Sequence, residues 1–141
     1  MRFVAWALPS LGLLLIATPA LAQESSQDPP IRLDRNYPNP FNPETTIPFY
    51  LGREMWDGGQ RPVVSIKIYN VLAQLVAVPV LQGTGEGLEN LELEWNGTGE
   101  YRAFWNGRVL RTDREAASGV YVYQLEVNGR RAGSKKMTVI K

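Results

Sequence analysis

The chain has 141 residues, with no cysteine and no histidine, and its 15 basic and 14 acidic residues leave a formal net charge of +1. Disulfides, thiolate nucleophiles and the usual general bases and transition-metal ligands are therefore missing, so we predict that the chain is not an enzyme and needs no cofactor or metal. The balanced charge also argues against nucleic acid as an obligatory partner.

The first residues have the features of a secretory signal peptide. Arg2 precedes an apolar run, and Ala20-Leu21-Ala22 supplies the small residues that a signal peptidase requires. We predict a signal peptide over residues 1–22, cleaved between Ala22 and Gln23, and export of the mature chain. The apolar run is shorter than the roughly 20 residues of a membrane span, so membrane insertion after cleavage is not expected; an uncleaved anchor is the alternative.

A polar, proline-rich stretch follows over residues 23–44. It contains the run Asn36-Tyr37-Pro38-Asn39-Pro40-Phe41-Asn42-Pro43, called the proline-rich segment below. Prolines cannot continue a helix or donate to an interior sheet ladder, so we predict an extended arm up to Thr45, where β-forming residues begin. The predicted folded domain covers residues 45–141.

Alternation of apolar and polar residues dominates from Thr45 onward and predicts short half-buried strands. Their apolar faces are Ile47, Phe49 and Leu51; Val64, Ile66 and Ile68; Leu91, Leu93 and Trp95; Tyr101, Ala103 and Trp105; and Tyr121, Tyr123, Leu125 and Val127. Pro79 should restrict the stretch from Ala73 to Leu81 to an edge strand or end its pairing early.

The last strands form the clearest predicted hairpin. Asn128-Gly129 is a type I′ turn signal, after which the chain returns through Met137 and Val139. With about seven short strands and no helical pattern, the sequence indicates an all-β fold, an immunoglobulin-like antiparallel β-sandwich.

Several loop and aromatic residues have two interpretations. Asn96-Gly97-Thr98 matches a glycosylation sequon, but we interpret it as a turn. Asp57-Gly58-Gly59 is interpreted as a flexible loop tip. The tryptophans are interpreted as packing residues, with a glycan-stacking role for Trp56, Trp95 or Trp105 as the alternative.

Five separated motifs occur in the order found in one known family. They are the proline-rich segment, the strand Val64 to Tyr69 followed by Asn70-Val71-Leu72-Ala73-Gln74, Trp105-Asn106-Gly107, Ser118-Gly119-Val120-Tyr121, and Lys135-Lys136-Met137-Thr138-Val139-Ile140-Lys141. Over residues 33–141 the chain resembles the type A C-terminal sorting domain of type IX secretion cargo, a relative of the immunoglobulin-like domain of flagellar hook-capping proteins.

This resemblance implies a secreted protein of a Gram-negative bacterium that an outer-membrane translocon recognises for delivery to the cell surface. The residues it implicates lie in the last hairpin: Gly119, Tyr121, Lys135, Lys136, Met137 and Lys141. Lys135 and Lys136 have a second interpretation, as charges that protect an edge strand from aggregation. Ala73 stands where the family usually has glycine, so we expect the turn there to avoid positive φ or to be reshaped.

The family's domain normally follows a large cargo, whereas only Gln23 to Arg32 precede it in the mature sequence here. Two other functions are therefore weighed beside sorting. One is a structural or adhesive module whose proline-rich arm adds to a neighbour's sheet edge. The other is a glycan-binding module.

Overall fold

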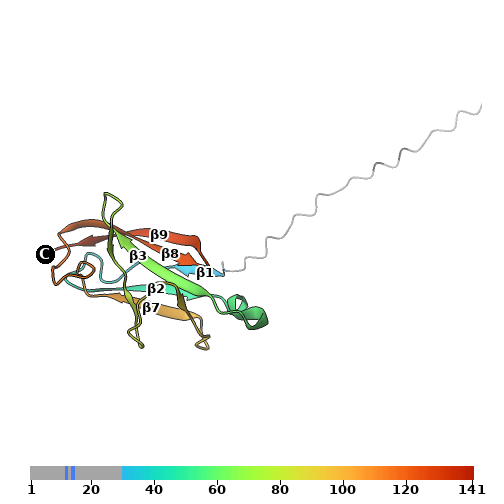
Figure 1. The fold of residues 1–141 in the computed structure, drawn as a ribbon. Coiled ribbons are helices and arrows are strands. Elements are labelled where there is room, and N and C mark those ends of the chain that lie inside the picture. The colour runs from blue at the N-terminus through green and yellow to red at the C-terminus, as the bar shows by residue number, and fades with distance from the viewer. Residues whose placement is uncertain (1–11, 13, 15–29) are drawn as a thin grey trace, which may run out of the picture.

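The computed structural model describes residues 12, 14 and 30–141 (Figure 1). The predicted signal peptide and its cleavage site at Ala22-Gln23 lie outside the described residues. Among the residues that are described, no helix has the length and apolar character needed to cross a membrane.

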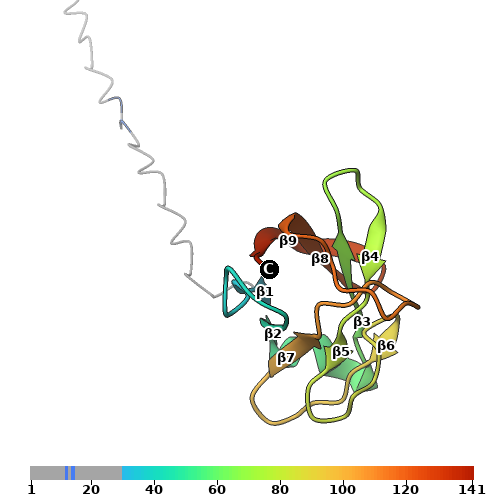
Figure 2. The same cartoon turned by 90° about the vertical axis from the view of Figure 1, so that its left-hand side faces the viewer.

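Two antiparallel sheets pack face to face and form a β-sandwich (Figures 1 and 2). One sheet has the strand order β1-β2-β7-β5, and the other has the order β4-β3-β8-β9, with β6 also paired to β3. The strands are β1 (Ile31–Leu33), β2 (Thr45–Leu51), β3 (Val63–Tyr69), β4 (Leu75–Ala77), β5 (Val80–Leu81), β6 (Leu91–Glu92), β7 (Glu100–Trp105), β8 (Gly119–Val127) and β9 (Arg130–Val139). The all-β sandwich predicted from sequence is confirmed, with two-residue strands raising the count above the predicted seven.

The core lies between the sheets and follows the predicted alternation. In β2, β7 and β8 every second side chain is buried, and Ile47, Ile66 and Leu125 are fully buried. Each such aliphatic side chain contributes about 1.5–3 kcal/mol to folding. In β3 Ser65 is buried as well, because its Oγ accepts a hydrogen bond from the Asn90 backbone N–H at 2.8 Å.

The chain changes sheets at Pro79. β4 is an edge strand of one sheet and β5 is an edge strand of the other, so the valine-rich stretch is divided between two edges. A proline has no N–H to donate and fits the point where pairing with one sheet stops. The prediction of an edge strand with early loss of pairing is confirmed.

The hairpin of β8 and β9 has the predicted turn. Asn128 and Gly129 have φ angles of 53° and 79°, and a type I′ turn requires positive φ at both of its central residues. The Asn128 side chain also accepts a hydrogen bond from the Val63 N–H at 2.9 Å, which ties the turn to β3.

Three local predictions need correction. The sandwich begins at Ile31 instead of Thr45, because β1 pairs with the end of β2 and buries Leu33. A short 3-10 element, η1 (Arg53–Gly59), follows β2 where no helix was predicted, although its backbone is not helical at Asp57 and Gly58, within the predicted loop tip. Ala73 has a φ of 59°, so this turn adopts the left-handed conformation that it was expected to avoid.

The turn at Ala73 keeps this conformation because Asn70 organises it. The Asn70 side-chain oxygen accepts hydrogen bonds from the N–H groups of Leu72 and Gln74, both at 3.0 Å, and the Ala73 N–H donates to the Asn70 carbonyl at 3.0 Å. An alanine in the left-handed region costs about 1 kcal/mol relative to glycine. The surrounding hydrogen bonds offset this cost.

Candidate functional site

The proline-rich segment lies against the end of β9, although almost 100 residues separate them in sequence (Figures 1 and 2). The Phe41 N–H donates to the Thr138 carbonyl, and the Phe41 carbonyl accepts from the Ile140 N–H, both at 3.0 Å. The Asn39 side chain accepts from the Thr138 N–H at 3.0 Å. Because Phe41 is also only 2% exposed, the segment is part of the sandwich, and the predicted extended arm is corrected here.

Tyr123 of β8, buried in the core, connects the last hairpin with the start of the proline-rich segment. Its side chain is fully buried, its hydroxyl donates to the Asp34 carbonyl at 2.8 Å, and the Asn36 N–H donates to that hydroxyl at 3.0 Å. Burial raises the pKa of Tyr123 to about 12, since the ionised phenolate would lose its hydration. The hydroxyl therefore stays protonated and holds the start of the proline-rich segment over β8.

Asn36 is a further buried polar anchor. Its side-chain amide donates to Thr45 Oγ1 at 3.1 Å and to the Pro38 carbonyl at 3.3 Å, and Thr45 Oγ1 donates to the same carbonyl at 3.0 Å. These bonds curl the segment over the beginning of β2. A buried amide group without a hydrogen-bond partner would cost about 1–3 kcal/mol. The curled conformation, which supplies partners for the Asn36 amide group, is therefore favoured over a straight one.

Gly107 connects a third motif to the same region. It has a φ of 79°, and a β-carbon at this position would overlap the Pro43 carbonyl oxygen. Only glycine allows both the left-handed backbone and this close approach. The Trp105-Asn106-Gly107 turn and the proline-rich segment thus depend on each other.

A basic hollow opens beside these contacts. Arg35, Asn39, Lys135 and Lys136 line a space of about 300 Å³, and we call these four residues the junction surface. Lys135 pairs across the hairpin with Tyr123, so its half-buried side chain lies on the inward face of β9, whereas Lys136 is exposed on the outward face. Three cations and no carboxylate line this hollow, which favours an anionic ligand.

The other hairpin residues implicated by the resemblance lie elsewhere. Met137 and Tyr121 are buried, and the Tyr121 hydroxyl donates to the Ala117 carbonyl at 2.7 Å. Gly119 is exposed where β8 begins, and the Lys141 N–H donates to Ser118 Oγ at 3.1 Å. Of the six candidates, therefore, only Lys135 and Lys136 belong to the junction surface.

Two residues of the junction surface were not predicted as site residues of the hairpin. Asn39 belongs to the proline-rich segment, which the sequence predicts as an extended entry motif apart from the hairpin, and nothing in the sequence marks Arg35. Both reach the surface because the proline-rich segment curls back, which depends on contacts with Tyr123 and Thr138 far along the chain. The sequence of residues 35–39 contains no local pattern that predicts those contacts.

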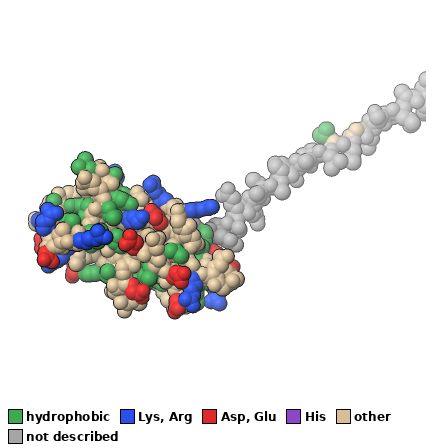
Figure 3. Space-filling model, in the orientation of Figure 1, with side chains coloured by type: hydrophobic (Ala, Val, Ile, Leu, Met, Phe, Trp, Pro, Cys, Tyr) green, Lys and Arg blue, Asp and Glu red, His purple; other side chains and the backbone are tan. Residues whose placement is uncertain are grey.

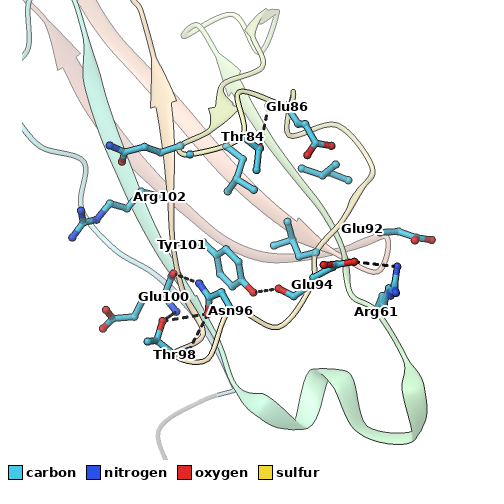
Figure 4. Close-up of a pocket in the computed structure, with 15 residues that line it drawn as sticks. Arg61, Thr84, Glu86, Glu92, Glu94, Asn96, Thr98, Glu100, Tyr101 and Arg102 are labelled. Carbon is cyan, nitrogen blue, oxygen red and sulfur yellow. Dashed lines mark hydrogen bonds and ion pairs between the residues drawn. The ribbon is translucent and has the colours of Figure 1, made fainter.

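A larger hollow of about 690 Å³ lies between the loops that flank β5 and β7 (Figure 4). It is built by ordinary turn contacts: Asn96 donates to the Glu100 carbonyl at 2.7 Å, and the Tyr101 hydroxyl points to the Glu94 carbonyl. Asn96-Gly97-Thr98 forms the predicted turn. Among residues 30–141 no group of three or more carboxylate, histidine or cysteine side chains is placed to hold a metal ion.

The three tryptophans weighed as stacking platforms differ in exposure. Trp105 is only 2% exposed, which removes it as a platform. Trp56 and Trp95 are half-buried, with ring centroids 5.1 Å apart in an edge-to-face arrangement, and they border a hollow of about 400 Å³. Both residues keep part of their surface exposed, and the Arg53 guanidinium lies over the Trp95 ring.

No protein-family model matches the chain, and no curated protein matches it. Among solved structures it is similar to Pseudomonas fluorescens alkylpurine DNA glycosylase AlkC, bound to DNA containing an abasic site analog, with a TM-score of 0.47 and 18% identity. The match covers 79% of this chain and 31% of the glycosylase chain. That protein is an enzyme, which contradicts the prediction that this chain is not one, and we do not carry the prediction further. A likeness at this level transfers no activity.

Proposed function

We propose that this chain is a sorting-type domain of an exported protein, recognised at the junction surface by an outer-membrane translocon for delivery to the cell surface. The observation that supports the proposal most is the contact between motifs that are distant in sequence. Asn39 and Phe41 bond to Thr138 and Ile140, and Pro43 packs on Gly107. Three motifs of the resemblance therefore meet in one region of the fold.

The charges of this region add to that support. Charge on the inward face of an edge strand protects it from aggregation, and Lys135 fits that role. Protection of the edge from aggregation would explain Lys135 alone. It does not explain why Lys136 and Arg35 line the same hollow as Lys135. Elsewhere positive and negative side chains are interspersed, as the face in Figure 3 shows. A local group of cations is a feature that a partner can recognise.

The test is charge reversal in the full-length chain, expressed in a Gram-negative bacterium with a type IX system. Lys135→Glu combined with Lys136→Glu should leave the circular dichroism spectrum unchanged and trap the protein in the periplasm. Arg130→Glu combined with Arg131→Glu is the matched control, because it places the same charge change on exposed residues of the same strand. Surface delivery of the Lys135/Lys136 variant at the level of the control would refute the proposal.

The half-buried tryptophans favour a second candidate function, glycan binding. Trp56 is fixed by a hydrogen bond from its Nε1 to the Leu93 carbonyl at 2.9 Å, and the Arg53 guanidinium lies 5.4 Å from the centre of the Trp95 ring. Rigid aromatic rings beside polar side chains are a common way to hold a sugar. Titration with soluble oligosaccharides should change tryptophan fluorescence in the wild type and not in Trp95→Ala; an unchanged wild-type spectrum would exclude this function.

A further inference from the structure

We infer that the free edge of β9 at Ser134 and Lys136 binds an extended, acidic peptide segment by strand addition. This inference deepens the proposed function, on which its biological meaning rests, by naming the chemistry of the partner at the junction surface.

The backbone of β9 offers unpaired groups at this edge. Residues of an antiparallel strand direct their N–H and C=O groups alternately toward and away from the paired strand. Thr138 points away from β8, because its N–H bonds to Asn39 and its carbonyl to Phe41. Lys136 and Ser134, two and four residues earlier in a continuous register, point the same way.

The edge is covered on both sides of a short open stretch. On one side β1 lies against β9, where a β-carbon on Gly133 would be 3.0 Å from the Leu33 side chain. Phe41 occupies the positions beside Thr138 and Ile140, where it forms a parallel bridge with Val139. Within residues 30–141, no segment other than those of the hairpin forms a hydrogen bond with the backbone of Ser134 or Lys136. Phe41 thus pairs with this edge through its backbone, and the backbone groups of Ser134 and Lys136 remain open between Phe41 and β1.

The charges around the open edge select an acidic partner. Lys135 and Lys136 lie on opposite faces of β9, and Arg35 is next to both in the hollow. The nearby Asp34 carboxylate is bound to the Arg32 guanidinium at 3.0 Å and is not among the residues that line this hollow. A strand added here would direct successive side chains to the two faces, and acidic residues on both would meet a cation.

The backbone groups favour a peptide over other polyanions. The carbonyls of Ser134 and Lys136 need hydrogen-bond donors, and a peptide backbone supplies N–H groups at the spacing of a strand. Phosphodiester groups carry acceptors and no donors, so the phosphates of nucleic acid or of an anionic lipid surface would pair with the cations and not with the carbonyls. Neither ligand presents donors at the regular spacing of a strand. A partner with both acidic side chains and a free backbone is the best match.

Binding can be tested with the full chain and a blocked hexapeptide of glutamate and valine, followed by fluorescence anisotropy and by amide NMR shifts. We expect shifts at the amides of residues 134–136 and a dissociation constant that increases with salt. Lys135→Glu with Lys136→Glu should weaken binding at least about tenfold, whereas Arg130→Glu with Arg131→Glu should change it less than about twofold.

A second peptide, N-methylated at alternate residues, separates strand addition from simple charge attraction. It keeps the acidic side chains and removes the backbone donors, so it should bind at least about tenfold more weakly. Equal binding of the N-methylated peptide would overturn the inference, and so would equally tight binding of a DNA duplex or of phosphatidylglycerol vesicles.

The two proposals fail in different ways. If the hexapeptide binds as expected and the Lys135/Lys136 variant is still delivered to the cell surface, the inference stands and the proposed function fails. If that variant is trapped in the periplasm and the hexapeptide does not bind the wild type, the proposed function stands and the inference is overturned.

Discussion

Replacing Tyr123 with phenylalanine removes one hydroxyl that connects the proline-rich region to the last hairpin. The ring is fully buried in β8 and stays in place, so the change creates almost no cavity. Two backbone groups lose their partner: the Asp34 carbonyl, which accepts from the hydroxyl at 2.8 Å, and the Asn36 N–H, which donates to it at 3.0 Å.

The expected loss follows from these two bonds. A hydrogen bond contributes about 0.5–1.5 kcal/mol net, and a buried group left without a partner costs about 1–3 kcal/mol. We predict that Tyr123→Phe lowers the free energy of unfolding by about 2 kcal/mol and the melting temperature by about 10 °C for a domain of this size. Hydrogen exchange at the Asn36 backbone amide should accelerate, because without the Tyr123 hydroxyl the proline-rich segment can open locally and expose this N–H to water.

Urea denaturation measured by circular dichroism gives the free energy, and Tyr121→Phe is the matched control. Within the described part of the chain the Tyr121 hydroxyl makes one hydrogen bond, to the Ala117 carbonyl, so its loss should cost about 1 kcal/mol. The reasoning is refuted if Tyr123→Phe costs no more than Tyr121→Phe, or if exchange at Asn36 is unchanged.

Three more predictions concern turns and ionisation. Ala73→Gly should stabilise the protein by about 0.5–1 kcal/mol, because glycine adopts a φ of 59° without strain. Gly107→Ala should destabilise it by at least about 2 kcal/mol, because the new methyl group overlaps the Pro43 carbonyl in a left-handed turn. The free energy of unfolding should fall as the pH rises from about 10 to 12. Unfolded Tyr123 ionises near pH 10, whereas the folded side chain, with its pKa raised to about 12, retains its proton over this range.

Each of these has its own control in thermal or urea denaturation. Ala77→Gly, in a strand and buried, should destabilise and so oppose the effect at Ala73. Gly87→Ala should be nearly neutral, since a β-carbon there meets no atom within 4 Å. Tyr123→Phe should reduce the alkaline fall. A destabilising effect of Ala73→Gly, a neutral effect of Gly107→Ala, or an alkaline profile that Tyr123→Phe leaves unchanged would contradict these predictions.

The strands with a long alternating pattern could be predicted from the sequence. β2, β3, β7 and β8 bury the faces that their alternation indicates, and the β8–β9 turn follows from Asn128-Gly129. These features depend on local chemistry: a two-residue period buries one face, and a type I′ turn needs residues that tolerate positive φ.

The proline-rich segment could not be placed from local chemistry. Its prolines exclude helix and interior strand, which is also true of a free arm, and the difference lies in tertiary contacts. Phe41 is buried because β9 and Trp105 are there to cover it, with the two rings 5.5 Å apart. Arg35 reaches the junction surface for the same reason. β1 was missed because three residues are too few to show a period.

The resemblance to a sorting domain predicts a recognised surface that includes Lys135 and Lys136, and it groups them with residues that the fold buries or places elsewhere. Met137 and Tyr121 are core residues, so variants at these positions test stability before they test recognition. Lys136 is exposed and Lys135 is half-buried, so their charge can be changed with less disturbance of the core. This makes them the sharper probes of function.

The surface fraction of the Lys135→Glu, Lys136→Glu variant tests the central claim most directly. Protease accessibility on intact cells, compared with total protein, measures this fraction for the variant, the wild type and the Arg130→Glu, Arg131→Glu control. We expect a surface fraction near zero for the Lys135/Lys136 variant, with folded protein in the periplasm, and wild-type values for the control. Equal surface fractions for all three proteins would contradict it.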